Sequence, residues 1–308
     1  MMKKILIITQ SQDYTVKYFS EKFKDQSIIY RLDLDNLNEY DLKITNEDTL
    51  IENSKFSIKM SEIDSIYYRK PRLPSLEDYD SIYHNLMKKD IIAFITGIAD
   101  SFQGKCLSKP SILKKAENKV YQLYMAKEIG LKVPNSLITN SSKGVQDFIL
   151  KQNSIIKPLS LGKFFEGDKV HIIHTNTVDS SIKVDNLELS PSYFQEYIEK
   201  EYEIRLTVVN NHFFPVKIIT KGKVDWRTDE AQGVEFENTT IPHDIEVKCL
   251  KLLKNLDLNF GAFDFLVKDG EYIFLEVNPN GQWLWLEKEL NLNIAQAIFD
   301  FLTGEKYE

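Results

Sequence analysis

The sequence predicts an α/β protein in which an N-terminal domain of alternating strands and helices precedes two α+β lobes. Short apolar runs of strand length alternate with a longer helical pattern over the first hundred residues. From Tyr193 onward strand patterns dominate, and tight turns join them. Breaks between these patterns predict an N-terminal α/β domain over residues 1–110, a small lobe over 111–197 and a large lobe over 198–308.

The N-terminal domain is predicted to be built on a sheet that is covered on both faces. Residues 4–9, 27–34 and 63–69 are short apolar runs, as expected for buried strands. Residues 83–102 recur with the three-to-four spacing of a helix. The prolines after residue 70 are predicted to end regular structure there. The proline at 110 lies in the connector that separates this domain from the next part.

The small lobe is predicted to begin with one long helix over residues 111–129, ended by Gly130 at the position of a C-terminal cap. Residues 154–157 form a short strand that stops at Pro158. Residues 159–169 contain two glycines among charged residues and are predicted to be a mobile loop.

The large lobe is predicted to be a sheet of hairpins with two helices. Asn210-Asn211 and Asp269-Gly270 are turn pairs, and the second is a strong hairpin signal. The predicted strands are residues 204–209, 213–220, 261–268 and 271–278, and the predicted helices are 245–256 and 294–302.

Composition disfavours several kinds of partner, although the average leaves local basic pockets open. A formal net charge of −7 disfavours a basic surface for nucleic acid. No run of about 18 apolar residues exists that could form a spanning helix. The only cysteines, Cys106 and Cys249, lack metal-type spacing, which indicates reduced thiols. We therefore expect a cytoplasmic protein without nucleic-acid or membrane partners.

Three oxygen-bearing side chains are predicted to converge in the last hairpin. Glu276 and Asn278 share one face of a strand because strand side chains alternate, while Leu275 and Val277 face the core. The turn folds Asp264 back beside them. Such a set, without His or Cys, suits Mg²⁺ completed by waters and substrate phosphates.

The alternative is that this hairpin face is merely solvated. Asp264 and Glu276, however, lie in apolar and aromatic segments, where an unpaired carboxylate would be costly to bury. Because two Mg²⁺ ions can bridge nucleotide phosphates during phosphoryl transfer, we expect two ions at this site.

The whole set of motifs resembles the ATP-grasp superfamily. In that superfamily the metal-binding segment is a strand with an Asp, a hairpin turn, and a second strand with the motif Glu-x-Asn-Pro. A pre-ATP-grasp α/β domain precedes the ATP-grasp fold in such ligases. The matching segments occur in the order expected for the superfamily. They are Ala116-Glu117-Asn118-Lys119, Gly130-Leu131-Lys132-Val133-Pro134, Ile155-Ile156-Lys157-Pro158, Phe194-Gln195-Glu196-Tyr197-Ile198 and Glu203-Ile204-Arg205.

The resemblance implies ATP as the cosubstrate and assigns roles to these residues. The nucleotide-binding residues it implies are Lys119 and Lys157 for the phosphates, Glu196, Tyr197 and Ile198 for adenine, and Glu203 near the ribose. The loop after Lys157, with only Gly162 and Gly167, is poorer in glycine than many phosphate loops of the superfamily.

Arg205 and Lys157 are the candidate catalytic residues. Arg205 is expected to hold the reacting carboxylate or the transferred phosphoryl group, since a guanidinium binds either one bidentately. The alternative is a strand-exposed salt bridge with Glu203 or Asp264. No general base for a hydroxyl nucleophile is assigned.

Three further segments resemble the ligases that make microviridins and related graspetides. The resemblance implies a ribosomal precursor peptide, with leader and core, in which Asp or Glu side chains are joined to Thr, Ser or Lys. We expect Arg69, Trp226 and Arg227 to bind this substrate, the Trp283-Leu284-Trp285 run to anchor an apolar leader, and the enzyme to be a homodimer. The segments are Ser65-Ile66-Tyr67-Tyr68-Arg69-Lys70-Pro71, Lys223-Val224-Asp225-Trp226-Arg227 and Asn278-Pro279-Asn280-Gly281-Gln282-Trp283.

The expected chemistry is ADP-forming activation of a carboxylate as an acyl phosphate, followed by attack of the acceptor. The alternative function is an ATP-grasp amino-acid ligase acting on a small molecule or a protein C-terminus. For these tryptophans, the alternative is that they are buried core residues, and for the arginines that they are surface charges.

Overall fold

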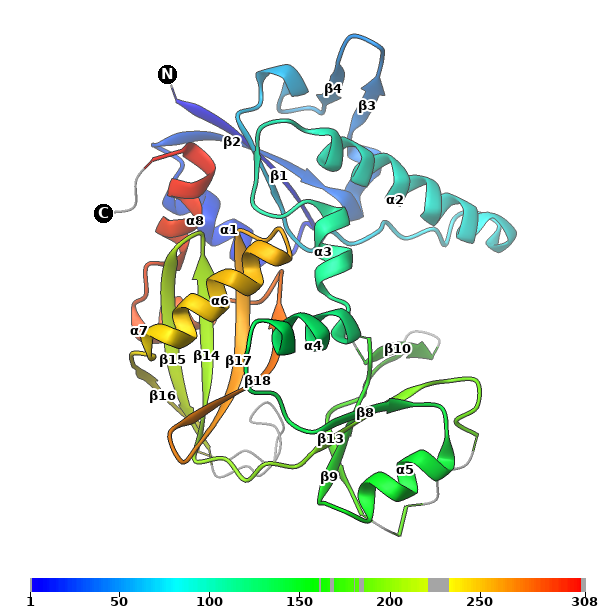
Figure 1. Ribbon diagram of the computed structural model, residues 1–308. Coiled ribbons are helices and arrows are strands. Elements are labelled where there is room, and N and C mark those ends of the chain that lie inside the picture. Colours follow the sequence, from blue (N-terminus) through cyan, green and yellow to red (C-terminus); the bar gives the residue numbers. More distant parts are fainter. Residues whose placement is uncertain are drawn as a thin grey trace.

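In the computed structural model, the chain forms an N-terminal domain, a small lobe and a large lobe (Figure 1). It describes residues 2–160, 162–166, 169–179, 181–182, 186–220 and 233–305. Within these residues, no helix is long and apolar enough to cross a membrane.

The N-terminal domain is built on a parallel sheet with the strand order β2-β1-β6-β7. Leu6 and Ile8 enter a core beneath α2, whereas Ile5 and Ile7 pack towards α1 on the opposite face. A small antiparallel sheet, β3-β4-β5, lies beside it. The elements are β1 Lys3–Thr9, α1 Tyr14–Lys22, β2 Ser27–Asp33, β3 Asp41–Ile44, β4 Thr49–Glu52, β5 Ser57–Lys59, β6 Ser65–Tyr68, α2 His84–Ser101 and β7 Lys105–Cys106, with 3₁₀ helices at Leu34–Glu39, Met60–Glu62 and Ser81–Tyr83.

The predicted long helix over residues 111–129 is wrong in one respect, because two helices replace it. Helix α3 is Pro110–Ala116 and α4 is Lys119–Glu128. Asn118 begins the second helix, and its Oδ1 accepts a hydrogen bond from the Tyr121 amide at 3.1 Å. The break puts Lys119 on the first turn of α4. Gly130 has the predicted left-handed conformation, with φ of 78°.

The small lobe contains an antiparallel sheet in the order β12-β9-β13-β8, with α5 packed against it. Val145 and Ile149 of α5 and Phe194 of β13 form its core. Residues 159–169 were predicted to be a loop, but β10 and the start of β11 form an antiparallel hairpin there. The strands and helix are β8 Ser136–Thr139, α5 Ser142–Ile149, β9 Ser154–Lys157, β10 Lys163–Glu166, β11 Lys169–Ile172, β12 Asn176–Val178 and β13 Ser192–Glu196.

The large lobe is an antiparallel sheet in the order β16-β15-β14-β17-β18. Helix α6 covers one face, while α7 and α8 pack on the other and reach the N-terminal domain, where Phe299 stacks on Phe23 with ring centroids 4.1 Å apart. The predicted turn is present, with positive φ at Asp269 and Gly270. The elements are β14 Tyr202–Val209, β15 His212–Ile219, β16 Glu235–Asn238, α6 His243–Asn255, β17 Phe260–Lys268, β18 Glu271–Asn278, α7 Leu284–Leu290 and α8 Ile294–Thr303.

A β-bulge in the last hairpin changes which side chains face the core. Asp264 pairs with Glu276 and Phe265 pairs with Phe274, so Leu275 is the extra residue. Phe274 and Val277 therefore both enter the core beneath α6. The prediction that Leu275 faces the core is wrong, because this side chain lines the cleft between the lobes.

Candidate active site

The predicted metal ligands do converge on one face of β17 and β18. The amide Nδ2 of Asn278 donates hydrogen bonds to Asp264 Oδ2 at 3.1 Å and to Glu276 Oε1 at 3.2 Å. Because Asp264 and Glu276 are cross-strand partners, the register of the hairpin holds their carboxylates side by side. The face is the one opposite the core beneath α6.

Two basic side chains neutralise these carboxylates. Arg205 is the partner of Asp264 across β14 and β17, and its Nη1 donates to Asp264 Oδ1 at 2.7 Å and Oδ2 at 2.8 Å. Lys119 Nζ lies 3.5 Å from Glu276 Oε2. The salt bridge with Asp264 that the alternative interpretation expects is therefore present, but Arg205 is only 8% exposed, so the pair is largely buried.

This group of side chains fits Mg²⁺. Two carboxylates and an amide oxygen are hard ligands, and Mg²⁺ takes one or two carboxylates together with waters and phosphates. Within the described ranges no cluster of three or more His, Cys, Asp or Glu side chains is found. The side-chain amide of Asn278 directs its nitrogen at the carboxylates. To bind a metal there, the amide group must flip so that its oxygen takes the place of the nitrogen.

The two predicted phosphate lysines lie at the same cleft. Lys119 Nζ donates to the carbonyl of Pro158 at 3.0 Å, directly after Lys157 at the end of β9. The ammonium of Lys157 lies 4.6 Å from the centre of the Tyr193 ring and is 8% exposed. Burial lowers the pKa of Lys157 to about 8, against the opposing charge of Glu276. Burial destabilises the charged form of Lys157, so an anionic ligand beside this ammonium group would stabilise it.

Two of the three residues predicted to bind adenine are held by backbone hydrogen bonds to neighbouring segments of the small lobe. The Glu196 amide donates to the Asn135 carbonyl at 2.8 Å, and the Tyr197 amide donates to the Asn153 carbonyl at 2.8 Å. Ile198 follows them at the exit from the small lobe. Contact of these three residues with adenine stays a prediction.

Gln195 is a site residue that we did not assign from the sequence. Its Nε2 donates to Ser136 Oγ at 3.0 Å and to the Tyr193 hydroxyl at 2.9 Å, but its Oε1 is buried with no hydrogen-bond partner. An orphan acceptor of this kind calls for a missing donor. Alternation along the strand could have revealed it, since Tyr193 and Gln195 share a face. The cleft is lined by Lys119, Gln122, Leu123, Val133, Tyr193, Gln195, Phe274 and Leu275.

Glu203, predicted to lie near the ribose, has a basic neighbour. Lys200 Nζ donates to Glu203 Oε1 at 2.6 Å, and Glu203 is 8% exposed. Glu203 shares a face of β14 with Arg205, as the alternation predicts. It therefore points to the side of the sheet that carries the metal ligands.

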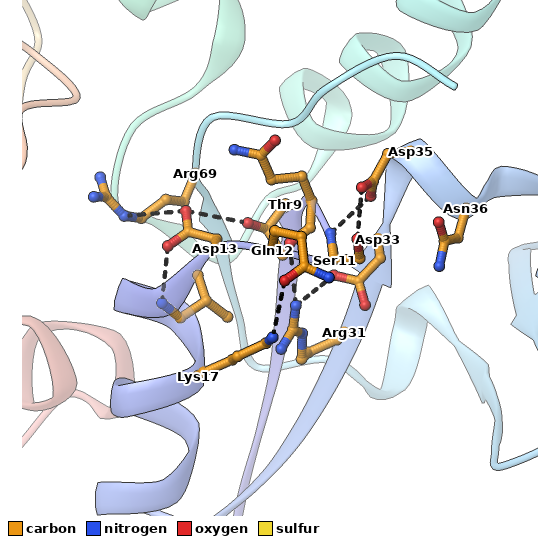
Figure 2. Close-up of polar contacts among 12 residues, drawn as sticks. Thr9, Ser11, Gln12, Asp13, Lys17, Arg31, Asp33, Asp35, Asn36 and Arg69 are labelled. Atoms are coloured by element: carbon orange, nitrogen blue, oxygen red, sulfur yellow. Dashed lines mark hydrogen bonds and ion pairs between the residues drawn. The ribbon is translucent and has the colours of Figure 1, made fainter. Parts of the chain in front are cut away.

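Arg69 lies deeper than a substrate-binding residue was expected to lie. It is 1% exposed, and Figure 2 shows its guanidinium beside Asp13, 3.7 Å from Nε to Oδ2. Its other nitrogens donate to Asn280 Oδ1 at 3.1 Å, to the Gly281 carbonyl at 3.3 Å and to Gln282 Oε1 at 2.5 Å. Arg69 thus fastens the N-terminal domain to the loop after the metal strand, and it can influence a substrate through that loop.

The aromatic run after the metal strand is part of the core. Trp283 is fully buried, and its Nε1 donates to the Tyr67 hydroxyl at 3.2 Å. Trp285 packs edge-on against Phe236. The prediction that this run anchors an apolar leader is therefore wrong for Trp283, because its ring has no exposed surface. Trp226 and Arg227 lie outside the described residues.

Comparison with protein families gives one match, in which residues 115–302 correspond to the RimK-like ATP-grasp domain. Among curated proteins, the chain is similar to the tetrahydromethanopterin:alpha-L-glutamate ligase of Methanocaldococcus jannaschii, with 24% identity over 63% of this chain and 68% of that protein. It is also similar to the alpha-aminoadipate–LysW ligase LysX of Sulfurisphaera tokodaii, with 23% identity over 75% of this chain and 83% of that protein.

Solved structures match nearly the whole chain. A RiPP-associated ATP-grasp ligase of Chryseobacterium gregarium, in complex with ADP and a leader and core peptide, has a TM-score of 0.89 and 26% identity, covering 100% of this chain and 98% of that one. The macrocyclase MdnC of Microcystis aeruginosa MRC, bound with the precursor peptide MdnA, has a TM-score of 0.87 and 26% identity over 98% of this chain and all of that one. MdnB from the same organism has a TM-score of 0.81 and 28% identity over 97% and 99%.

Proposed function

This chain belongs to the RimK-like ATP-grasp family, and on that basis we propose that it is an ATP-dependent peptide macrocyclase. It activates Asp or Glu side chains of a ribosomal precursor peptide as acyl phosphates and joins them to Thr, Ser or Lys side chains. The products are ω-ester or ω-amide rings, ADP and phosphate.

One observation carries the proposal. The similarity to the ligase complexed with leader and core peptide extends over 100% of this chain, and so includes the N-terminal domain that lies outside the family match. A common ATP-grasp core alone would support any carboxylate ligase. Arg69 joins the N-terminal domain to the loop after the proposed metal strand, which supports an acceptor site that this domain helps to form.

The charged groups of the cleft suit the two steps of the reaction. Lys119 and Lys157 would hold the nucleotide phosphates, and Arg205 would orient the carboxylate that attacks the γ-phosphoryl group. Mg²⁺ held by Asp264, Glu276 and Asn278, in two ions, would neutralise charge on the phosphates. An acceptor hydroxyl or amine then attacks the acyl carbon, loses its proton, and releases phosphate.

Substrate contacts at Arg69, Trp226 and Arg227 belong to the same proposal, as do adenine contacts at Glu196, Tyr197 and Ile198 and a ribose contact at Glu203. We further propose that the enzyme works in the cytoplasm and as a homodimer. Its partner is the precursor peptide, because the neighbouring structures with peptide bound resemble it over their whole length.

A second function has its own support. The curated relatives are ligases that add glutamate or aminoadipate to other acceptors, at 24% and 23% identity. An amino-acid ligase acting on a small molecule or a protein C-terminus would use the same ATP and Mg²⁺ site. The two functions differ only in the acceptor and the carboxylate donor.

The test is mass spectrometry of a candidate precursor peptide, sought as a short Thr/Ser- and Asp/Glu-rich reading frame beside the gene, after incubation with enzyme, ATP and Mg²⁺. The proposal expects loss of one water per ring, with ester rings reopened by mild base, and no loss with the Glu276→Gln variant. An unmodified peptide, together with ADP release that depends on a free amino acid, would overturn the macrocyclase and favour the amino-acid ligase.

A further inference from the structure

Lys70 stands at the edge of the N-terminal sheet where open parallel sheets bind ligands. The chain passes from β1 to β2 on one side and later returns to β6 on the other side of β1, so the strand order reverses at β1. Ligands of such sheets bind beyond the carboxyl ends of the strands at this reversal. Lys70 follows the last residue of β6 by two positions. Its place in the fold therefore favours a role in substrate binding.

The backbone of Lys70 is strained. Its φ is 42°, in the left-handed region that residues other than glycine seldom adopt, and Pro71 follows it directly. The residue before it is fixed, because the Arg69 amide donates to the Ile8 carbonyl at 2.8 Å and the Arg69 side chain is buried. Strain of this kind persists only where the surrounding structure enforces it, and it clusters at functional sites.

Lys70 and Arg205 approach the same loop from different domains. The carbonyl of Gly281 in this loop accepts a hydrogen bond from Arg69 Nη1 at 3.3 Å, and a Cβ on Gly281 would lie 3.0 Å from Arg205 Nη2. The positive charges of Lys70 and Arg205 are near enough to repel each other. Two cations that share half-buried surroundings are costly unless an anion lies beside them.

Donors around this loop lack acceptors. Arg205 Nη1 donates to both oxygens of Asp264, but among the described residues its Nε is buried without a hydrogen-bond partner. Arg69 Nε is buried in the same way, since Asp13 Oδ2 lies 3.7 Å from it, beyond hydrogen-bond distance (Figure 2). The Lys70 ammonium makes no hydrogen bond or salt bridge within the part of the chain that the structure describes. Unpaired donors of this kind indicate a missing acceptor.

The charged groups that face Lys70 do not offset its burial. Burial lowers the pKa of Lys70 to about 8, and Arg69 lowers it further. Arg205 acts in the same direction, whereas the carboxylates of Asp13 and Glu117 raise the pKa. Asp13 is already engaged, because it caps α1 and lies beside Arg69. A bound anion would restore the charged form of Lys70, which disfavours a role as the base that deprotonates the acceptor.

We propose that Lys70 is a substrate-binding residue, and that its ammonium group and the Nε side of the Arg205 guanidinium together hold the donor carboxylate of the peptide. A guanidinium binds a carboxylate through two of its nitrogens, and Asp264 occupies only Nη1 of Arg205. Lys70 adds a second cation from the N-terminal domain, so the carboxylate is fixed between two domains. The identity of the substrate rests on the proposed function, whereas the presence of an anion site does not.

Steady-state kinetics with the precursor peptide, at saturating ATP and Mg²⁺, test this role. Lys70→Met should lower kcat/KM for the peptide by about 10- to 100-fold, the effect of losing a hydrogen bond between charged groups. The Kd for ADP should not change. Arg72→Met is the control, because it removes the same charge from an exposed side chain of the same segment. Circular dichroism checks that both variants are folded. Equal losses in the two variants would mean that only the overall charge matters, and would overturn the proposal.

The dependence on pH separates this role from a structural one. Lys70 loses its charge above about pH 8, so kcat/KM of the wild type for the peptide should fall there. Saturating ATP keeps Lys157 charged, because an adjacent phosphate raises the pKa of a lysine. Lys70→Arg retains a positive charge throughout this range, so it should restore activity and move the fall to higher pH. A fall at the same pH in the wild type and in Lys70→Arg would contradict the proposal.

Failure of the proposed function gives a different result from failure of this inference. If the wild type leaves the precursor unmodified but releases ADP with a free amino acid, the macrocyclase is wrong, and the variants are assayed with that amino acid. A raised KM of Lys70→Met for it would still support carboxylate binding by Lys70. An unchanged KM for the carboxylate substrate overturns the inference. So does weaker ADP binding with an unchanged peptide KM, because the missing anion would then be a nucleotide phosphate.

Discussion

The side-chain amide of Gln122 pairs with the backbone of Val277 as a neighbouring strand would. Gln122 Nε2 donates to the Val277 carbonyl at 2.8 Å, and the Val277 amide donates to Gln122 Oε1 at 3.0 Å. Val277 stands between Glu276 and Asn278 on the edge strand of the sheet. Helix α4 therefore satisfies the sheet edge at the place where the proposed metal ligands, Glu276 and Asn278, would have to be rigid.

Replacing Gln122 by leucine should cost both stability and turnover. Two buried backbone groups of Val277 would lose their partners, so we expect the free energy of unfolding to fall by about 2–4 kcal/mol. The ligands on either side would lose their fixed position, and turnover should fall more than nucleotide affinity. Urea unfolding and ADP release measure the two effects. Gln103→Leu, at an exposed glutamine, is the control, and equal effects in both variants would contradict this role.

Glu276→Gln tests the metal site directly. The change removes a charge with little change of shape, so the protein should fold while turnover falls by about 100-fold or more. Glu271→Gln is the matched control, because Glu271 lies on the same strand but is exposed and paired with Lys132. Near-normal ADP release by Glu276→Gln would rule out its assignment as a metal ligand.

Lys157 should lower the stability of the unliganded protein. Burial lowers its pKa from 10.5 to about 8, so between these values the unfolded chain binds more protons than the folded one. The free energy of unfolding should therefore rise with pH across this window. At pH 7, Lys157→Met should stabilise the fold by about 1–3 kcal/mol while abolishing ADP binding.

Urea unfolding at pH 7 and pH 10 checks this sign. The advantage of Lys157→Met over the wild type should shrink at the higher pH, where the folded wild type has already released the proton. Lys132→Met, at a side chain 52% exposed, should show no such dependence. If Lys157→Met is less stable than the wild type at pH 7, the buried charge of Lys157 does not destabilise the folded protein, and this prediction is wrong.

Local sequence patterns predicted much of this fold because strands and turns depend on neighbouring residues. The alternation around Glu276 and the turn at Asp269-Gly270 brought the three predicted metal ligands together as expected, although metal binding itself stays a prediction. The bulge at Leu275 was missed, because it depends on the register between two paired strands and not on the sequence of one strand. The break at Asn118 was missed because the apolar spacing continues through it.

Burial was harder to predict than position. Arg69 contacts Asn280, Gly281 and Gln282, more than two hundred residues away in the chain, and no local pattern reveals such a contact. For the same reason, an exposed arginine could not be distinguished from a buried one. Trp283 was misjudged in the same way, although large aromatics are mostly buried.

Gln195→Leu should weaken adenine recognition more than catalysis. Gln195 lines the cleft between the lobes, and its buried, unpartnered Oε1 could accept a hydrogen bond from the adenine amino group. Loss of one such bond is worth about 1–1.5 kcal/mol, so the KM for ATP should rise by about 10-fold with little change in kcat. The difference in KM between ATP and GTP should become smaller. An unchanged KM for ATP would show that Gln195 does not bind the base.

Gly281→Ala should disturb the reaction through Arg205. A Cβ on Gly281 would lie 2.5 Å from Ala262 Cβ and 3.0 Å from Arg205 Nη2, so the loop or the guanidinium must move. We expect stability to fall by about 1–3 kcal/mol and turnover to fall by about 10-fold or more. The control is Gly144→Ala, where a Cβ meets only ordinary contacts at 3.5 Å.

A double variant separates packing from catalysis at this position. Adding Ala262→Gly to Gly281→Ala removes the 2.5 Å contact but leaves the one with Arg205. Because the remaining contact involves the group that pairs with Asp264, stability should recover in part while turnover stays low. Urea unfolding and ADP release are measured for both single variants and the double variant. Recovery of turnover together with stability would mean that Gly281 serves only the packing of the sheet, and that its closeness to Arg205 has no part in the reaction.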